Sequence, residues 1–215
     1  MNILIRKFIN DYIKELENAL NSIDQPKIEQ AIQLLTTTYK NRKRVFIIGN
    51  GGSAALASHM ACDLGKGTLA GVYEKKEKRL QVMSLTDNIS ILTAYGNDLS
   101  FNDVFVEQLK NLAEKDDLVI VISGSGNSKN IIKAVRYAKE CGVKTIGLSG
   151  FKTGGKLAQM ADCSIIVQST HYGPIEDVHL VLNHIIASYF AVVKREMDGI
   201  SKYNNHAVPF KKEKT

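Results

Sequence analysis

The first 40 residues follow a helical pattern of apolar and polar positions. Apolar side chains recur every three or four positions over residues 1–22, which predicts an amphipathic helix. Ser22 to Pro26 interrupts the pattern, and Pro26 suits the first turn of a second helix that ends near Lys40. We therefore expect two helices before any strand.

After residue 40 the pattern changes to short apolar runs. Such runs are typical of strands that are buried on both faces of a parallel sheet. They cover residues 44–49, 80–85, 118–123, 144–149 and 163–168. Helical patterns cover residues 53–65, 128–141 and 174–197. This alternation of strands and helices predicts a doubly wound α/β sheet with right-handed crossovers.

Composition and charge narrow the class of protein. The 215 residues are 44% hydrophobic and 23% charged, which suits a globular chain with a sizeable core. Part of the net charge of +6 lies in mixed Lys/Glu runs at 73–79 and in a polar tail from Ser201, so nucleic-acid binding is not favoured. No apolar run spans a bilayer and no secretory signal begins the chain, so we expect a cytoplasmic protein. Three widely spaced cysteines imply no disulfide framework.

Two glycine- and serine-rich segments are candidate anion sites. GNGGS at 49–53 and SGSGNS at 123–128 each follow a predicted strand and open a predicted helix. Backbone N–H groups and a helix N-terminus there can bind a phosphate, although each loop alone could be a tight turn without a ligand. Two such loops at the carboxyl ends of parallel strands indicate a phosphorylated ligand. Without an element that reads adenine or ribose, a sugar phosphate is favoured over a nucleotide.

Titratable side chains gather in two segments. His59 and Asp63 are four residues apart and share a helix face, as two metal ligands, an acid–base pair or an ordinary surface pair would. Four more polar side chains lie near the start of the last, largely apolar helix, where they serve either a site or a capping turn. They are Glu176, Asp177, His179 and His184. Spacing alone does not choose among these four.

Several longer segments, in one order from about residue 40 to 195, resemble a known family. They are GNGGSAALASHMACDL, GNDLSFNDVF, SGSGNSKNIIKAVRYAKECGVKTIGLSG, GGKLAQMADCSIIV and IEDVHLVLNHII. Together they resemble the sugar isomerase (SIS) domain family and, within it, the phosphoheptose isomerases. The resemblance implies a three-layer α/β/α sandwich with a five-stranded parallel sheet and two N-terminal helices.

The resemblance also implies an organisation and an activity. The expected parts are an N-terminal helical segment for oligomerisation at 1–40, the SIS domain at 41–198 and a polar tail at 199–215. The expected assembly is a homotetramer with active sites at subunit interfaces. The expected reaction is aldose–ketose isomerisation of sedoheptulose 7-phosphate to D-glycero-D-manno-heptose 7-phosphate through an enediol. Its product would feed surface heptose synthesis, for lipopolysaccharide or capsule.

Site residues follow from the same resemblance, position by position. It implies a zinc ion held by His59, Asp63, Glu176 and His184. Asp63 or Glu176 would be the catalytic base, and His184 the second acid–base group. The substrate-binding positions would be Asn50, Gly51, Gly52, Ser53, Asn97, Asp98, Ser123, Gly124, Ser125, Ser128 and Glu176.

Two of the four metal positions depart from the best-known members. Asp63 stands where those members have glutamate, and Glu176 stands where they have glutamine. A His–Asp–Glu–His set still suits zinc, but its two carboxylates would bring the formal charge of the site near zero. The alternatives are an SIS isomerase of another phosphosugar, a sugar-phosphate sensor, and a noncatalytic SIS protein that binds a replication-initiation partner.

Overall fold

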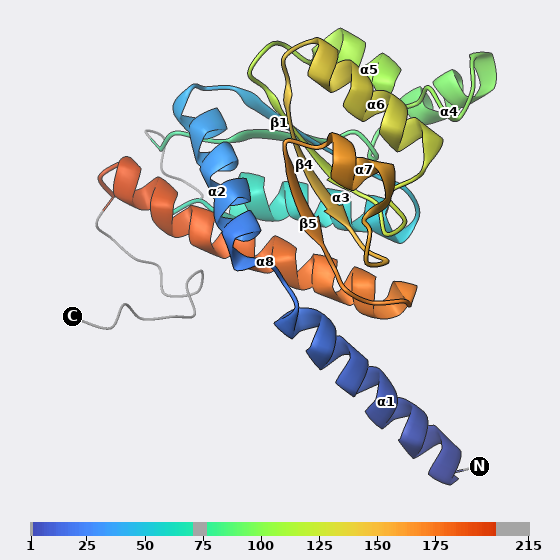
Figure 1. The fold of residues 1–215 in the computed structure, drawn as a ribbon. Helices are drawn as coiled ribbons and strands as arrows, with labels where there is room; N and C mark the ends of the chain where they lie inside the picture. The colour runs from blue at the N-terminus through green and yellow to red at the C-terminus, as the bar shows by residue number, and fades with distance from the viewer. Residues whose placement is uncertain (1, 71–76, 201–215) are drawn as a thin grey trace.

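The computed structural model describes residues 2–70 and 77–200, and it contains one parallel sheet of five strands (Figure 1). The spatial order is β2-β1-β3-β4-β5. The strands are β1 (Arg44–Gly49), β2 (Gln81–Ser84), β3 (Leu118–Ile122), β4 (Lys144–Ser149) and β5 (Cys163–Ile166). From β1 the chain adds β2 on one side and then β3, β4 and β5 on the other, so the order of strands switches between β1 and β3. Open α/β sheets bind ligands at the carboxyl ends of the strands at such a switch point.

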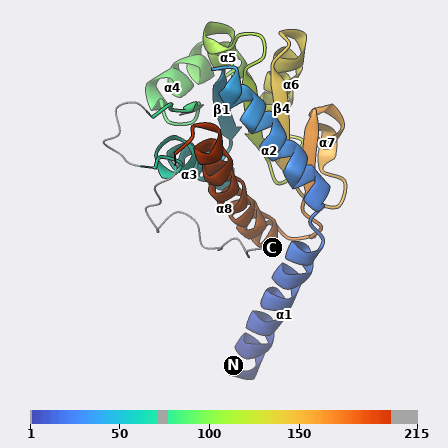
Figure 2. The same ribbon diagram turned by 90° about the vertical axis from the view of Figure 1, so that its left-hand side faces the viewer.

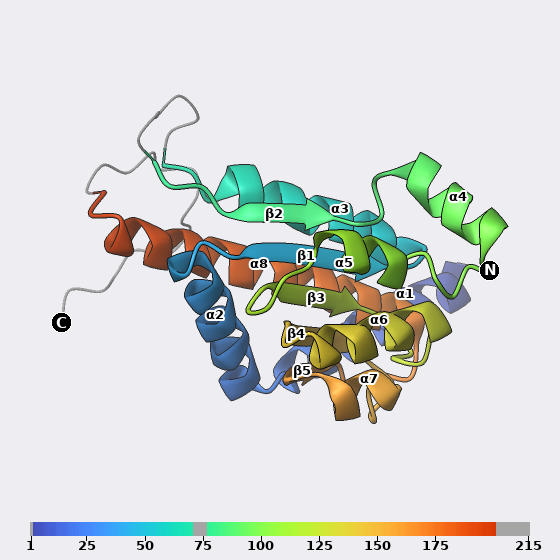
Figure 3. The ribbon, with the colours of Figure 1, turned by 90° about the horizontal axis from the view of Figure 1, so that it is seen from above.

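Helices cover both faces of the sheet, which confirms the three-layer sandwich (Figures 1 and 3). Alternate residues of β1 divide between the two cores, since Val45 and Ile47 face one layer and Phe46 and Ile48 the other. The first layer contains α2 (Gln25–Lys40), α3 (Gly52–Cys62) and α8 (Tyr172–Met197). The second contains α5 (Val106–Leu112), α6 (Lys129–Glu140) and α7 (Gly155–Met160).

The predicted helix over 53–65 is corrected in its last three residues. Regular α-helix ends at Cys62, and a π-helical turn, η1 (Asp63–Gly67), continues the chain. Single π-helical turns occur often at functional sites, because they change the direction of the side chains that follow. Here the turn begins at one of the two candidate ligands on this segment.

The N-terminal helices have different surroundings. Pro26 lies in the first turn of α2, as predicted, and α2 packs into the core against α8. Helix α1 (Asn2–Asn21) instead extends away from the sandwich and contacts the body through α8 (Figures 1 and 2). Large apolar side chains along its first two thirds are exposed, namely Ile3, Leu4, Ile5, Phe8, Ile9 and Ile13.

Other differences from the predicted pattern are local. Three strands end one or two residues earlier than predicted, and α8 begins at Tyr172 rather than at Pro174. The sequence pattern did not predict α4 (Ile89–Asp98), α5 or α7. The polar tail from Ser201 lies outside the described residues, as do residues 73–76 of the first Lys/Glu run. None of the helices in the described ranges is long and apolar enough to cross a membrane.

Candidate active site

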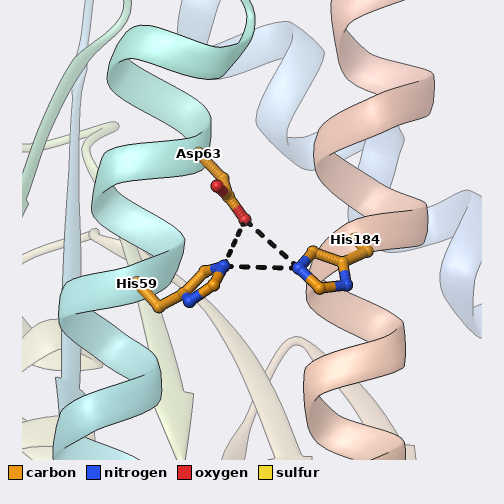
Figure 4. A group of neighbouring side chains, drawn as sticks. All are labelled: His59, Asp63 and His184. Carbon is orange, nitrogen blue, oxygen red and sulfur yellow. Dashed lines mark hydrogen bonds and ion pairs between the residues drawn. The ribbon is translucent and has the colours of Figure 1, made fainter. Parts of the chain in front are cut away.

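Two histidines and an aspartate meet between helices α3 and α8 (Figure 4). His59 and Asp63 come from one segment and His184 from the facing helix, and the three side chains point toward one another. His59 Nε2 lies 3.1 Å from Asp63 Oδ2 and 3.3 Å from His184 Nε2. His184 Nε2 lies 3.7 Å from the same Asp63 oxygen. The structure thus joins residues that are 125 positions apart.

The spacing of these three atoms fits a metal ion. Around a tetrahedral zinc with bonds of about 2.0–2.2 Å, neighbouring ligand atoms lie about 3.3–3.6 Å apart. The two Nε2 atoms also face each other, and a neutral imidazole nitrogen without hydrogen can only accept. A cation among the three atoms would engage both nitrogen lone pairs and the carboxylate charge. The donor set therefore suits zinc.

The four polar side chains at the start of α8 have four different surroundings. His184 faces His59, as described above. Glu176 places its carboxylate against Gly52, outside the group of three atoms. Asp177 Oδ2 accepts a hydrogen bond of 2.6 Å from the Tyr12 hydroxyl of α1, and this bond raises the pKa of Tyr12 to about 12. His179 is fully buried, and its Nε2 donates to the Ser149 carbonyl oxygen at 3.2 Å.

A cavity of about 270 Å³ lies between the first glycine loop and His59, the one member of the histidine group that lines it. Its lining includes Gly52, Ser53, His59 and Glu176. A Cβ atom at position 52 would lie 3.0 Å from Glu176 Oε2, so glycine makes room for this carboxylate. Gly51 is the N-cap residue of α3, and its φ of 55° is one that glycine adopts without strain. The loop and the candidate ligands therefore share one groove.

The two candidate phosphate loops are joined by a pair of amides. Asn50 follows β1, and Asn130 is buried in the first turn of α6. Asn50 Nδ2 donates to Asn130 Oδ1 at 3.0 Å, and Asn130 Nδ2 donates back to Asn50 Oδ1 at 2.9 Å. Because β1 and β3 are neighbours in the sheet, this pair fixes the spacing of the loops at the point where ligands bind.

The second loop presents serine hydroxyls around the start of α6. Ser123 Oγ accepts from the Gly126 N–H at 3.2 Å, and Ser125 Oγ accepts from the Asn127 N–H at 3.3 Å. Ser128 is the N-cap residue, but its side chain makes no capping hydrogen bond. A hydroxyl that accepts from the backbone still has a hydrogen to donate, so all three serines can donate to an anion.

Asn97 and Asp98 lie apart from this group in the chain described. They end α4, both are exposed, and Asn97 Nδ2 donates to Asp98 Oδ1 at 2.8 Å. Helix α4 is at the outer end of the second layer (Figures 1 and 3). These two predicted substrate-binding residues are not brought into the groove between α3 and α8.

Two buried amides near the site were missed by the sequence reasoning. Asn183 donates from Nδ2 to Asp63 Oδ2 at 2.7 Å, and Asn130 bonds Asn50 as described. Asn183 falls on the same helical face as Val178, His179, Leu182 and Ile186, all of them buried. A polar residue at a core position of an apolar helix was the available signal.

The buried histidine predicts a pH dependence of stability. Burial lowers the pKa of His179 from 6.5 to about 4, so between these values the unfolded chain binds one more proton than the folded one. Stability should therefore fall by about 1.4 kcal/mol per pH unit as pH decreases through this window. His179→Gln keeps a donor for the Ser149 carbonyl but cannot take up this proton. Its free energy of unfolding should therefore vary by about 3 kcal/mol less over this pH range. Urea unfolding with chelator present measures both proteins. Equal profiles for the two proteins would contradict the assignment.

Comparisons with known proteins agree with the fold and show the family of the chain. Residues 8–150 match the family model described as SIS domain. The phosphoheptose isomerase of Helicobacter pylori strain P12 is 38% identical over 183 residues, which is 85% of this chain and 92% of the relative. That of Campylobacter concisus is 42% identical over 159 residues, or 74% of this chain and 81% of the relative.

A solved structure of a phosphoheptose isomerase is also similar to this chain. The phosphoheptose isomerase of Neisseria gonorrhoeae has a TM-score of 0.76 at 30% identity, and the match covers 89% of this chain and 98% of the other. The similarity to these enzymes thus extends over most of the chain. The same chain has the sheet order, the two joined loops and the histidine group described above. The chain belongs to the SIS domain family and, within it, to the phosphoheptose isomerases.

Proposed function

We propose that the protein is an aldose–ketose isomerase that converts sedoheptulose 7-phosphate to D-glycero-D-manno-heptose 7-phosphate. The observation that carries the proposal is the meeting of His59, Asp63 and His184, with His59 lining a cavity that begins at the first glycine loop. The group of three side chains suits proton transfer, and the second loop, joined to the first by Asn50 and Asn130, suits a phosphate. Family membership supplies the sugar.

Zinc is the metal that the three donors fit best. Two imidazole nitrogens and one carboxylate leave a fourth position open, as in catalytic zinc sites. With Glu176 outside the group, the formal charge of a zinc site is +1, rather than the near-zero value of a set with two carboxylates. When bound, zinc would polarise the substrate carbonyl and stabilise negative charge on oxygen. Residues His59, Asp63 and His184 would hold it.

The proposed chemistry is proton transfer between neighbouring carbons. A carboxylate removes the proton from the carbon next to the carbonyl, which leaves a cis-enediol, and it returns the proton to the other carbon. His184 would move the second proton between the two oxygens through Nδ1, because its Nε2 would be engaged by the metal. Asp63 is our choice for the base because it lies beside His184, and Glu176 is placed to bind a substrate hydroxyl in the groove.

The loops would supply binding energy away from the reacting carbons. The Ser123, Ser125 and Ser128 hydroxyls and the N-terminus of α6 suit a phosphate dianion. The first loop, through Asn50 to Ser53, would hold the sugar over α3. Fixing the phosphate in this way orients the carbonyl end toward the histidines.

An NMR time course with a panel of ketose phosphates tests the function. Sedoheptulose 7-phosphate is expected to give the heptose 7-phosphate at a rate above that of pentose, hexose and aminosugar phosphates. Conversion of another member of the panel alone would move the assignment to a different phosphosugar. No conversion of any member, with zinc supplied, would favour a noncatalytic SIS protein.

The amide pair between the loops predicts an effect on substrate binding. Asn130→Leu removes both hydrogen bonds and frees Asn50, so the spacing of the loops is no longer fixed. We expect KM for the sugar phosphate to rise by about 10-fold and kcat to change less, since the altered contacts are remote from the reacting carbons. Steady-state kinetics measures both, with the exposed neighbour Lys129→Ala as control. An unchanged KM would contradict the role of the pair.

We further propose that residues 1–40 serve oligomerisation, residues 41–198 form the catalytic domain, and 199–215 are a tail. The support is the exposed apolar face of α1, which costs free energy in water unless a second copy covers it. A homotetramer would also let another copy bring Asn97 and Asp98 to the groove. We place the enzyme in the cytoplasm, where it would supply heptose for lipopolysaccharide or capsule.

The oligomer has a direct test. Phe8→Glu puts a charge in the middle of the exposed face of α1 and should lower the mass measured by light scattering. Lys7→Glu, a charge change at the adjacent polar position, is the matched control and should keep the wild-type mass. Equal masses for the wild type and Phe8→Glu would remove α1 from the interface.

A further inference from the structure

Asn183 contacts the proposed metal site, but the proposed reaction gives it no role. Its side chain is fully buried on α8, directly before His184. Its Nδ2 atom donates to Asp63 Oδ2 at 2.7 Å, across the contact between α8 and the π-helical turn η1. Because a carboxylate only accepts, the amide nitrogen, rather than the amide oxygen, must face Asp63.

Packing alone gives no reason for an amide at this position. The Oδ1 atom of Asn183 is buried and has no hydrogen-bond partner among the residues that the structure describes. A buried acceptor without a partner costs free energy, whereas a leucine of similar size would fill the same space without that cost. The bond to Asp63 is therefore the feature that distinguishes asparagine from an apolar residue here.

The bond acts on the atom that matters for the site. Asp63 Oδ2 is also the oxygen that lies 3.1 Å from His59 Nε2 and 3.7 Å from His184 Nε2. Asp63 is the first residue of η1, and Asn183 lies on the facing helix α8. A donor from the opposite helix aims this oxygen toward both histidines.

We propose that Asn183 is a positioning residue that holds the Asp63 carboxylate in the geometry needed to bind the metal. This inference rests on the proposed metal site. Partners that orient a metal ligand typically contribute 10–100-fold to metal affinity or activity. A residue with a purely structural role would instead change stability and leave metal affinity unaltered.

The test compares zinc affinity and stability in the full-length chain. Zinc affinity is measured by competition with a chromophoric chelator, and the thermal midpoint is measured on metal-free protein. Asn183→Leu should weaken zinc binding by about 10–100-fold and keep or raise the thermal midpoint. The control is Gln108→Leu, which removes a buried amide that donates to the Leu85 and Val104 carbonyls. It should lower the midpoint and keep zinc affinity.

A double-mutant cycle tests whether the effect passes through Asp63. In an Asp63→Ala background, Asn183→Leu should change zinc affinity by less than about twofold, because the oxygen it would orient is gone. Asn183→Ala, which cannot clash, replaces Asn183→Leu if the latter does not fold. Wild-type zinc affinity in Asn183→Leu, or an equal loss in the Asp63→Ala background, would overturn the inference.

The cycle also separates this inference from the proposed function. If the wild type binds no zinc, the proposed metal site fails, and this inference fails with it. If the wild type binds zinc and Asn183→Leu binds it equally well, only the inference fails. If zinc binds and Asn183→Leu weakens it, but no sugar phosphate is isomerised, the inference stands and the proposed reaction fails.

Discussion

Removal of zinc by a chelator is expected to lower kcat for the isomerisation by at least ~100-fold, because polarisation of the carbonyl by a metal contributes several kcal/mol to transition-state stabilisation. His59, Asp63 and His184 meet at distances that suit one tetrahedral ion. Addition of one equivalent of zinc per chain should restore turnover. Magnesium should restore little, because two imidazole ligands suit zinc better.

His59→Ala gives an independent measure of the same effect. It removes one of three donors, so zinc should bind more weakly and kcat should fall at any subsaturating zinc concentration. His171→Ala is the matched control, since His171 is also exposed but bonds Glu15 rather than the site. Full turnover of metal-free protein, or an equal effect of both substitutions, would remove the metal from the mechanism.

The sequence predicted the central strands and helix α6 well, but it did not predict α4, α5 and α7. β1, β3 and β4 are almost entirely buried, so their continuous apolar runs carry a strong signal. Helix α4 has no buried residue, and it packs on the core only through the partly buried Leu92 and Tyr95, so its sequence signal is weak. Helices α5 and α7 have seven and six residues, which is too short for a helical period to be recognised.

The residues of the site also differ in how well the sequence predicted them. The loops and the His59–Asp63 pair are local features, and local spacing found them. The partner of His59 is 125 positions away on α8, so only the resemblance selected His184 before the structure did. The amides Asn130 and Asn183 were missed, because their partners lie 80 and 120 positions away and a buried amide has no motif of its own.

Asp63→Asn is expected to lower kcat by about 10²–10⁴-fold, the range of a general base, even at saturating zinc. Asp63 lies 3.7 Å from His184 Nε2, whereas the Glu176 carboxylate lies against Gly52 in the groove. Glu176→Gln keeps the shape of the side chain and a hydrogen-bonding oxygen. It should therefore raise KM and lower kcat by less than about 10-fold.

The comparison is informative only if loss of the base is separated from loss of the metal. Zinc content should be measured on each variant, and kcat should be compared at full occupancy. Exchange of the substrate C–H proton with deuterated water then reports proton removal directly, since it needs the base but not product release. Loss of exchange in Asp63→Asn with retention in Glu176→Gln assigns the base to Asp63. The reverse pattern would give that role to Glu176 and leave Asp63 as a ligand oriented by Asn183.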